Sequence, residues 1–110
     1  MSIFLIETWV VKPEDLEIHD LLWIEYVDYM RKNLSLFAEI KSMRLFKTIQ
    51  EQDVVTHAQI VEFESLAEKM NLDSRISEDK KSVEFKHKLM QVKNIETATA
   101  VLCDSFLEFY

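Results

Sequence analysis

Glu7 is the residue of the first predicted strand that is best suited to chemistry. It lies between Leu5 and Trp9 on one face of an apolar run, and a carboxylate in such a place is costly to bury unless it is paired or protonated. Burial that favours the protonated form would make Glu7 a general base for taking a proton from an acidic carbon or a phenol. The alternative is a structural salt bridge to Arg44 or to a lysine of a neighbouring strand, or a position at the rim of the sheet.

His57 is the second candidate for acid–base chemistry, because it falls in the middle of a predicted strand. If the strand register places it on the face of Glu7, a His–Glu pair would orient the imidazole for proton transfer or metal binding. In the alternative interpretation, His57 is hydrogen-bonded within a dimer interface. His19, one helical turn before Trp23, lines the mouth of a pocket together with Tyr26 or lies partly exposed at the surface.

Aromatic side chains could form the wall of a ligand site or pack in the core: Trp9, Trp23, Tyr26 and Tyr29. His87 shares a helical face with Val83 and Met90, and we expect it to pack there. The candidates for ligand binding are therefore Trp9, His19, Trp23 and Tyr26, and those for catalysis are Glu7 and His57.

The spacing of the histidines matches none of the patterns H-x-H, H-x-x-x-H or H-E-x-x-H, so a metal site would have to assemble across strands or subunits. The chain has no glycine, which excludes phosphate-cradling loops, dinucleotide fingerprints and a serine nucleophile elbow. Cys103 has no base beside it in sequence, so covalent catalysis is not expected. We therefore predict neither a metal nor a cofactor.

Composition limits the partners. The chain has 110 residues, 48% of them hydrophobic, which fits a single domain over residues 1–110. Its 13 basic and 20 acidic residues give a net charge of −7, and the basic residues are scattered, which argues against nucleic acid and anionic membrane surfaces as partners. No apolar stretch is long enough to span a membrane. The single cysteine favours a cytoplasmic location.

Hydrophobic periodicity predicts strands at residues 3–12, 39–50, 54–64 and 97–104, with a turn at 51–53. A helix follows Pro13 and ends near Asn33. Ser65 and Glu68 match a capping box that starts a second helix, which we expect to run to residue 71, bend near 73–74 and resume from 77 to 93. Residues 82–92 are ambiguous, because 82–89 alternate like a strand while their composition favours helix; we choose helix.

Both faces of the first strand are apolar. Ile3, Leu5, Trp9 and Val11 project to one side, and Phe4, Ile6 and Val10 project to the other. A sheet of this kind must be covered on both faces, and the chain carries enough helix for one. We therefore expect a second copy of the chain to cover the other face in a homodimer.

The order strand, helix, strand, strand, helix, strand, with the segment VEFESLAE at 61–68, resembles the dimeric α/β-barrel superfamily, which includes antibiotic-biosynthesis and haem-degrading monooxygenases. The resemblance implies an α+β, ferredoxin-like βαββαβ fold with an antiparallel four-stranded sheet. It also implies that two sheets pack face to face in a dimeric barrel, with a ligand pocket between the sheet and the helices of each subunit.

The site residues of those monooxygenases are poorly matched. Those enzymes resemble one another in an Asn on the first strand, a Trp near the third strand and a His near the start of the second helix. In this chain, Glu7 lies near the position of the Asn. The third strand has His57 and Gln59 but no Trp, and residues 70–76 contain no His. These departures weaken haem cleavage and cofactor-free oxygenation as expectations.

Two functions are consistent with these features. The first is a dimer that binds an apolar or aromatic metabolite and acts on it by proton abstraction or cofactor-independent oxygenation, with Glu7 or His57 reaching into a cavity. The second is a non-catalytic interaction or structural module with a fully packed core.

Overall fold

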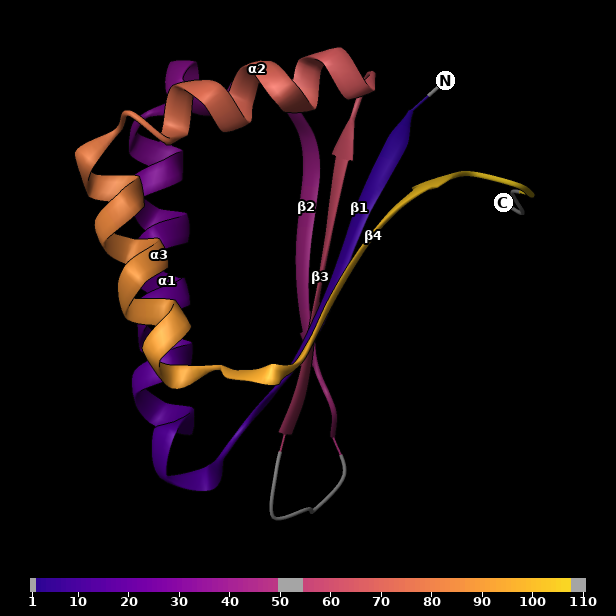
Figure 1. The fold of residues 1–110 in the computed structure, drawn as a ribbon. Coiled ribbons are helices and arrows are strands. Elements are labelled where there is room, and N and C mark those ends of the chain that lie inside the picture. Colours follow the sequence, from indigo (N-terminus) through magenta and orange to yellow (C-terminus); the bar gives the residue numbers. More distant parts are fainter. Residues whose placement is uncertain (1, 50–54, 108–110) are drawn as a thin grey trace.

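The chain folds into one antiparallel sheet with its helices gathered on one face (Figure 1). The computed structural model describes residues 2–49 and 55–107. Its elements are β1 (Ile3–Val11), α1 (Leu16–Lys32), β2 (Ile40–Lys47), β3 (Val55–Phe63), α2 (Leu66–Ile76), α3 (Lys80–Val92) and β4 (Asn94–Asp104), with short 3-10 turns at Pro13–Asp15 and Leu34–Phe37. The strand order is β2-β3-β1-β4. This is the ferredoxin-like α+β fold, as the element order predicts.

The strand register separates two faces. Along β1 and β3, Trp9 lies opposite His57 and Glu7 lies opposite Gln59. Because side chains alternate along a strand, all four project toward the helices. Ile6 lies opposite both Ile60 and Val101, and these side chains project to the other face. The alternation predicted from sequence is confirmed.

The helical face holds the core. The ten buried apolar side chains are Trp9, Val11, Trp23, Tyr26, Phe37, Val61, Phe63, Leu72, Ile76 and Leu89. They come from β1, β3, all three helices and the turn before β2, so the core lies between the sheet and the helical layer. None of the helices in residues 2–49 and 55–107 has the length and apolar composition needed to cross a lipid bilayer.

The opposite face of the sheet is not covered by any described element (Figure 1). Phe46 and Val101 on this face are 46% and 52% exposed. The radius of gyration is 14.6 Å, larger than the roughly 13 Å expected for a compact chain of this length. The subunit therefore has an open, one-sided shape.

The second half of the chain differs from the sequence prediction in three places. The helix that begins at Ser65 does not bend near residues 73–74 but continues to Ile76, because both Leu72 and Ile76 are buried in the core. The break comes at 77–79, and β4 begins at Asn94, three residues before the predicted start. Residues 82–92 are helical, as their composition predicted. The predicted turn at 51–53 and the last three residues lie outside the described part.

His87 is exposed, so the expectation that it packs beside Val83 and Met90 was wrong; both of those side chains are largely exposed too. The buried side of α3 is instead formed by Ser82 and Leu89, with Phe85 partly buried between them. The helix is therefore rotated relative to the predicted packing.

Asp79 fixes the start of α3. Its carboxylate accepts the backbone N–H of Ser82 at 3.0 Å and the hydroxyl of Tyr29 on α1 at 2.9 Å. A carboxylate at this position satisfies one of the free N–H groups of the first helical turn. Burial raises the pKa of Asp79, but the hydrogen bonds from Ser82 and Tyr29 outweigh it and hold the pKa below its usual value.

We predict that Asp79→Ala lowers the free energy of unfolding by about 1–2 kcal/mol, the usual cost of losing a helix cap. Asp79→Ser should recover most of this loss, because serine also caps helices. The recovery should be incomplete, because the shorter serine side chain cannot reach Tyr29 in the same way. Glu78→Ala is the control, since Glu78 is exposed. Urea unfolding at neutral pH measures all three, and an unchanged Asp79→Ala midpoint would contradict the capping role.

Candidate functional site

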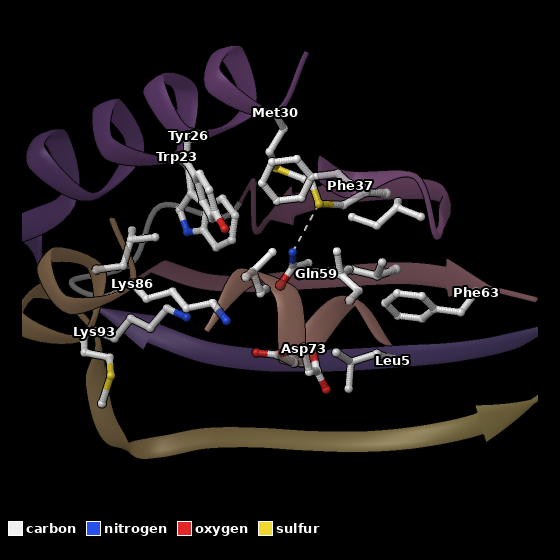
Figure 2. A pocket seen from close by; sticks show the side chains of 18 residues that line it. Leu5, Trp23, Tyr26, Met30, Phe37, Gln59, Phe63, Asp73, Lys86 and Lys93 are labelled. Atoms are coloured by element: carbon white, nitrogen blue, oxygen red, sulfur yellow. Dashed lines mark hydrogen bonds between the residues drawn. The ribbon is translucent and has the colours of Figure 1, made fainter. Parts of the chain in front are cut away.

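A cavity of about 290 Å³ lies between the sheet and the helices. Figure 2 shows side chains from all three helices and from the strands converging on it. Most of its wall is apolar or aromatic, and includes Leu5, Trp23, Tyr26, Met30, Phe37, Met43, Val61, Phe63, Leu72 and Leu89. A space of this kind suits a small, largely apolar molecule.

Five polar side chains complete the wall: Glu7, Gln59, Asp73, Lys86 and Lys93. Glu7 and Gln59 are cross-strand neighbours on β1 and β3. The Gln59 amide donates to the Met43 sulfur at 3.2 Å, and a thioether is a weak acceptor. A ligand oxygen could therefore take the place of this sulfur as the partner of the amide.

Lys93 is half-buried and follows directly after α3. Its Nζ lies 3.9 Å from the centre of the Trp9 ring and 5.7 Å from that of Trp23, so its charge is placed over aromatic faces. Burial lowers the pKa of Lys93; the charge of Glu7 opposes this shift and that of Lys86 adds to it. Lys93 thus holds its proton less firmly than a surface lysine.

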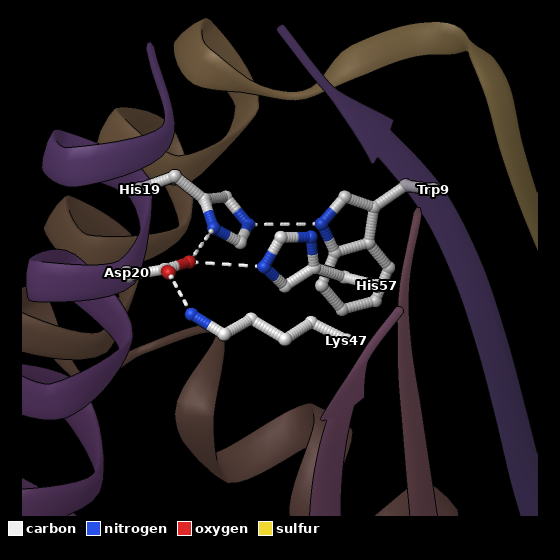
Figure 3. Close-up of polar contacts among 5 residues, drawn as sticks. All are labelled: Trp9, His19, Asp20, Lys47 and His57. Carbon is white, nitrogen blue, oxygen red and sulfur yellow. Dashed lines mark hydrogen bonds and ion pairs between the residues drawn. The ribbon is translucent and has the colours of Figure 1, made fainter. Parts of the chain in front are cut away.

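A polar cluster surrounds the buried side chains of Trp9, His19 and His57 (Figure 3). The indole N–H of Trp9 donates to His19 Nε2 at 2.8 Å. Asp20 Oδ1 is 2.9 Å from both His19 Nδ1 and His57 Nε2. Lys47 Nζ donates to Asp20 Oδ2 at 3.0 Å. We call these five residues the histidine cluster.

Trp9 determines where the protons of the histidine cluster lie. An indole nitrogen is only a donor, so His19 Nε2 must accept, and the proton of the neutral ring must be on Nδ1, facing Asp20. Burial lowers the pKa of His19 and outweighs the opposing hydrogen bond to Asp20. Asp20 is itself favoured as the anion: burial raises its pKa, but the bonds from His19, Lys47 and His57 lower it below the usual value.

The three donor groups of His19, Asp20 and His57 lie within 4.8 Å of one another, close enough to suggest a metal site. A metal on His19 Nδ1 would leave a proton on Nε2, directed at the N–H of Trp9. A metal-bound histidine normally donates this proton to an acceptor. The observed hydrogen bonds therefore favour a network of hydrogen-bonded side chains over a metal site. The absence of a bound metal stays a prediction.

His57 also borders a surface groove. This groove is lined by residues of α1 and β2, among them Asp20 and Lys47, and by His57 of β3. His57 Nδ1 is buried and has no hydrogen-bond partner in the described part of the chain. With Nε2 held by Asp20, this nitrogen is left as a free acceptor whenever the ring is neutral.

The structure divides the predicted site residues into two groups. Glu7, Trp23 and Tyr26 line the cavity. Trp9, His19 and His57 do not line it and belong to the histidine cluster instead. His19 is fully buried, so it lies neither at a pocket mouth nor at the surface.

Two pairings that the sequence left open for Glu7 do not form in the described part of the chain. His57 and Glu7 share a face, but the carboxylate that His57 contacts is Asp20 of α1. Arg44 lies opposite Ile60 on the uncovered face, so it cannot pair with Glu7. The acid–base roles of Glu7 and His57 are separate from these pairings and stay predictions.

Sequence reasoning missed Asp20, Lys47, Lys86 and Lys93. One signal was available for Asp20: a charged residue inside the otherwise apolar stripe of α1, directly after a histidine. Lys93 gave no signal, because a lysine after an amphipathic helix is ordinarily solvated.

We predict that Asp20→Asn lowers the free energy of unfolding at neutral pH by about 1–3 kcal/mol, because it replaces the carboxylate that His19, His57 and Lys47 contact with a neutral amide, whose NH₂ group must face one of these donors. The lowered pKa of Asp20 means that its contribution is present above the usual value of 3.8 and is lost as the pH falls through the lower folded-state value. The measurement is urea unfolding as a function of pH.

The control is Asp28→Asn. Asp28 pairs with Lys32 on the exposed side of α1 at 2.9 Å, and an exposed pair of this kind contributes less than about 1 kcal/mol. Equal losses in the two variants would show that the histidine cluster is no more important for stability than a surface pair.

No protein-family model and no curated protein matches the chain. Solved structures do. The cofactor-independent oxygenase SnoaB from Streptomyces nogalater superposes with a TM-score of 0.66 at 9% identity, over 97% of this chain and 95% of that one. An antibiotic biosynthesis monooxygenase gives a TM-score of 0.69 at 19% identity, over 96% and 99%.

A third similar structure is a dimeric protein of unknown function with a ferredoxin-like fold from Bacteroides fragilis, with a TM-score of 0.68 at 12% identity, over 94% of this chain and 96% of that one. Identities this low establish the fold alone. The chain thus shares the architecture of antibiotic-biosynthesis monooxygenase-like and dimeric ferredoxin-like proteins.

Proposed function

We propose that the chain forms a homodimer in which each subunit binds one small apolar or aromatic molecule and removes a proton from it. The observation that carries this proposal is the cavity of about 290 Å³, which has an apolar wall and a few polar groups at defined places. Such a space also argues against the alternative of a fully packed structural module.

The dimer is supported by the uncovered face of the sheet. Phe46 and Val101 are largely exposed there, and Phe4, Ile6 and Ile60 are half-buried. Covering apolar surface contributes roughly 25 cal/mol for each Å² removed from water. A second copy offers the same apolar face, and two of the similar structures are described as dimeric.

Glu7 is the proposed base. Its carboxylate reaches the cavity from the middle of a strand, so the sheet fixes its position. The proton moves from an O–H or acidic C–H of the ligand to a Glu7 oxygen, leaving an enolate or phenolate. The Gln59 amide and the Lys93 ammonium are placed to stabilise the negative oxygen that develops.

Cofactor-independent oxygenation is a more specific reaction within this proposal. An enolate or phenolate is electron-rich, and O₂ can oxidise such an anion without a metal or flavin. SnoaB, which shares the fold, is described as a cofactor-independent oxygenase. The protein part of this chemistry is the same as for simple proton abstraction: exclusion of water, a fixed base and a stabilised anion.

His57 is assigned a supporting role. It does not line the cavity, but its ring stacks on Trp9 at a centroid distance of 6.1 Å, and Asp20 holds its Nε2. The histidine cluster therefore holds Trp9 in place beside the cavity.

We predict that Phe46→Glu with Val101→Glu converts the dimer to monomers, because the changes place charges on the apolar face of each copy. Met70→Glu is the control, since Met70 is 61% exposed on α2, on the helical side. Sedimentation velocity at micromolar concentration gives the masses. A monomeric unaltered protein would contradict the dimer.

We predict that Glu7→Gln lowers turnover of a responsive phenol, quinol or enol by about 100-fold or more while the ligand still binds, as expected for loss of a general base. Oxygen uptake and absorbance report turnover, and calorimetry reports binding. Glu17→Gln, an exposed change on α1, is the control. Unchanged turnover would remove Glu7 from the mechanism, and binding without turnover by the unaltered protein would leave only the binding function.

A further inference from the structure

Two lysine side chains line the cavity. Lys86 lies on α3, and Lys93 is the extended residue directly after the helix. They are close enough for the charge of Lys86 to act on Lys93. In Figure 2 both side chains extend into the cavity on the side away from Phe63. The cavity thus has a cationic end and an apolar end.

The positive charge at this end is not balanced by the protein. Four charged side chains line the cavity: Glu7, Asp73, Lys86 and Lys93. Asp73 already pairs with Lys69. In the described part of the chain, neither Lys86 nor Lys93 forms an ion pair, and Glu7 acts on Lys93 only through its charge at longer range. Two cations face one free carboxylate, in a chain whose net charge is −7.

The imbalance is costly at Lys93. An unpaired lysine is ordinary in water, but Lys93 is half-buried, with its Nζ 3.9 Å from the centre of the Trp9 ring and 5.7 Å from that of Trp23. Burial and the neighbouring charge of Lys86 both disfavour its ammonium and lower its pKa. A single negative charge placed between the two amines would offset both effects.

We propose that the natural ligand of the cavity is an apolar acid, whose anionic oxygen group lies between Lys86 and Lys93 and whose apolar body extends toward Phe37 and Phe63. This inference rests on the proposed function, since it names the ligand class of the same cavity, but it does not require Glu7 to act as a base. A carboxylate ligand, or a phenol or enol that has lost its proton, meets the requirement.

Cinnamic acid and cinnamyl alcohol form a matched pair of probes, because they share an apolar skeleton and differ in the anionic group. We expect the acid to bind the dimer at least about 10-fold more tightly than the alcohol at neutral pH, the usual scale for hydrogen bonds to charged groups. Lys93→Met should abolish this preference, and Lys86→Met should reduce it less, since Lys86 is exposed. Isothermal titration calorimetry measures each affinity.

Lys88→Met is the control, because Lys88 lies on the same helix, is exposed and does not line the cavity. Lys93→Gln is a second variant in case Lys93→Met fails to fold, as judged by circular dichroism. The indole resonances of Trp9 and Trp23 should shift on binding of the acid.

The outcomes separate the two proposals. Equal affinity for acid and alcohol, or a preference that survives Lys93→Met and Lys93→Gln, overturns the acid-binding inference and leaves the cavity as a site for neutral molecules. Binding of neither probe overturns the inference together with the proposed small-molecule function. A phenol tested in the same way at low and high pH shows whether a phenolate can replace the carboxylate.

Discussion

The hydrogen bond from Trp9 to His19 is the interaction on which the arrangement of the site depends. Trp9 is 1% exposed and His19 is fully buried, so water cannot substitute for either partner. Because the indole only donates, it fixes the tautomer of His19, and the remaining imidazole proton must go to Asp20. Asp20 then holds His57 through the same oxygen. One donor on β1 thus determines the orientation of groups from α1 and β3.

The same tryptophan links the histidine cluster to the cavity. Its ring stacks against Trp23, with centroids 6.1 Å apart, and Lys93 lies over its face. A rotation of Trp9 would therefore cost the His19 bond and remove the support of Lys93 together. Side chains held by packing and hydrogen bonds on both sides cannot relax freely around a ligand, which is the condition for a preorganised site.

Local patterns predicted most of the fold, and non-local contacts explain what they missed. Alternation and helical stripes depend on neighbouring residues, so they located the four strands and separated the two faces of β1. They placed Ile40 on the face of Phe46, but a register shift after Ile40 turns it toward the cavity. The break after Ile76 was missed because it depends on burial of Leu72 and Ile76 and on the cap by Asp79. The Asp20–His57 contact depends on how α1 lies over β3, and the burial of Lys93 depends on tryptophans of β1 and α1, which no short window of sequence contains.

The alternation of β1 also assigns separate tasks to the two faces of the sheet. Its odd-numbered residues, such as Glu7 and Trp9, face the cavity and the histidine cluster, whereas Phe4 and Ile6 face the uncovered side. The proposed dimer would use only the second set, so a partner subunit would not block the cavity. Because both sets belong to one strand, however, packing of a partner against Ile6 would restrain the backbone that carries Glu7. Dimerisation would then stiffen the site without contributing a side chain to it.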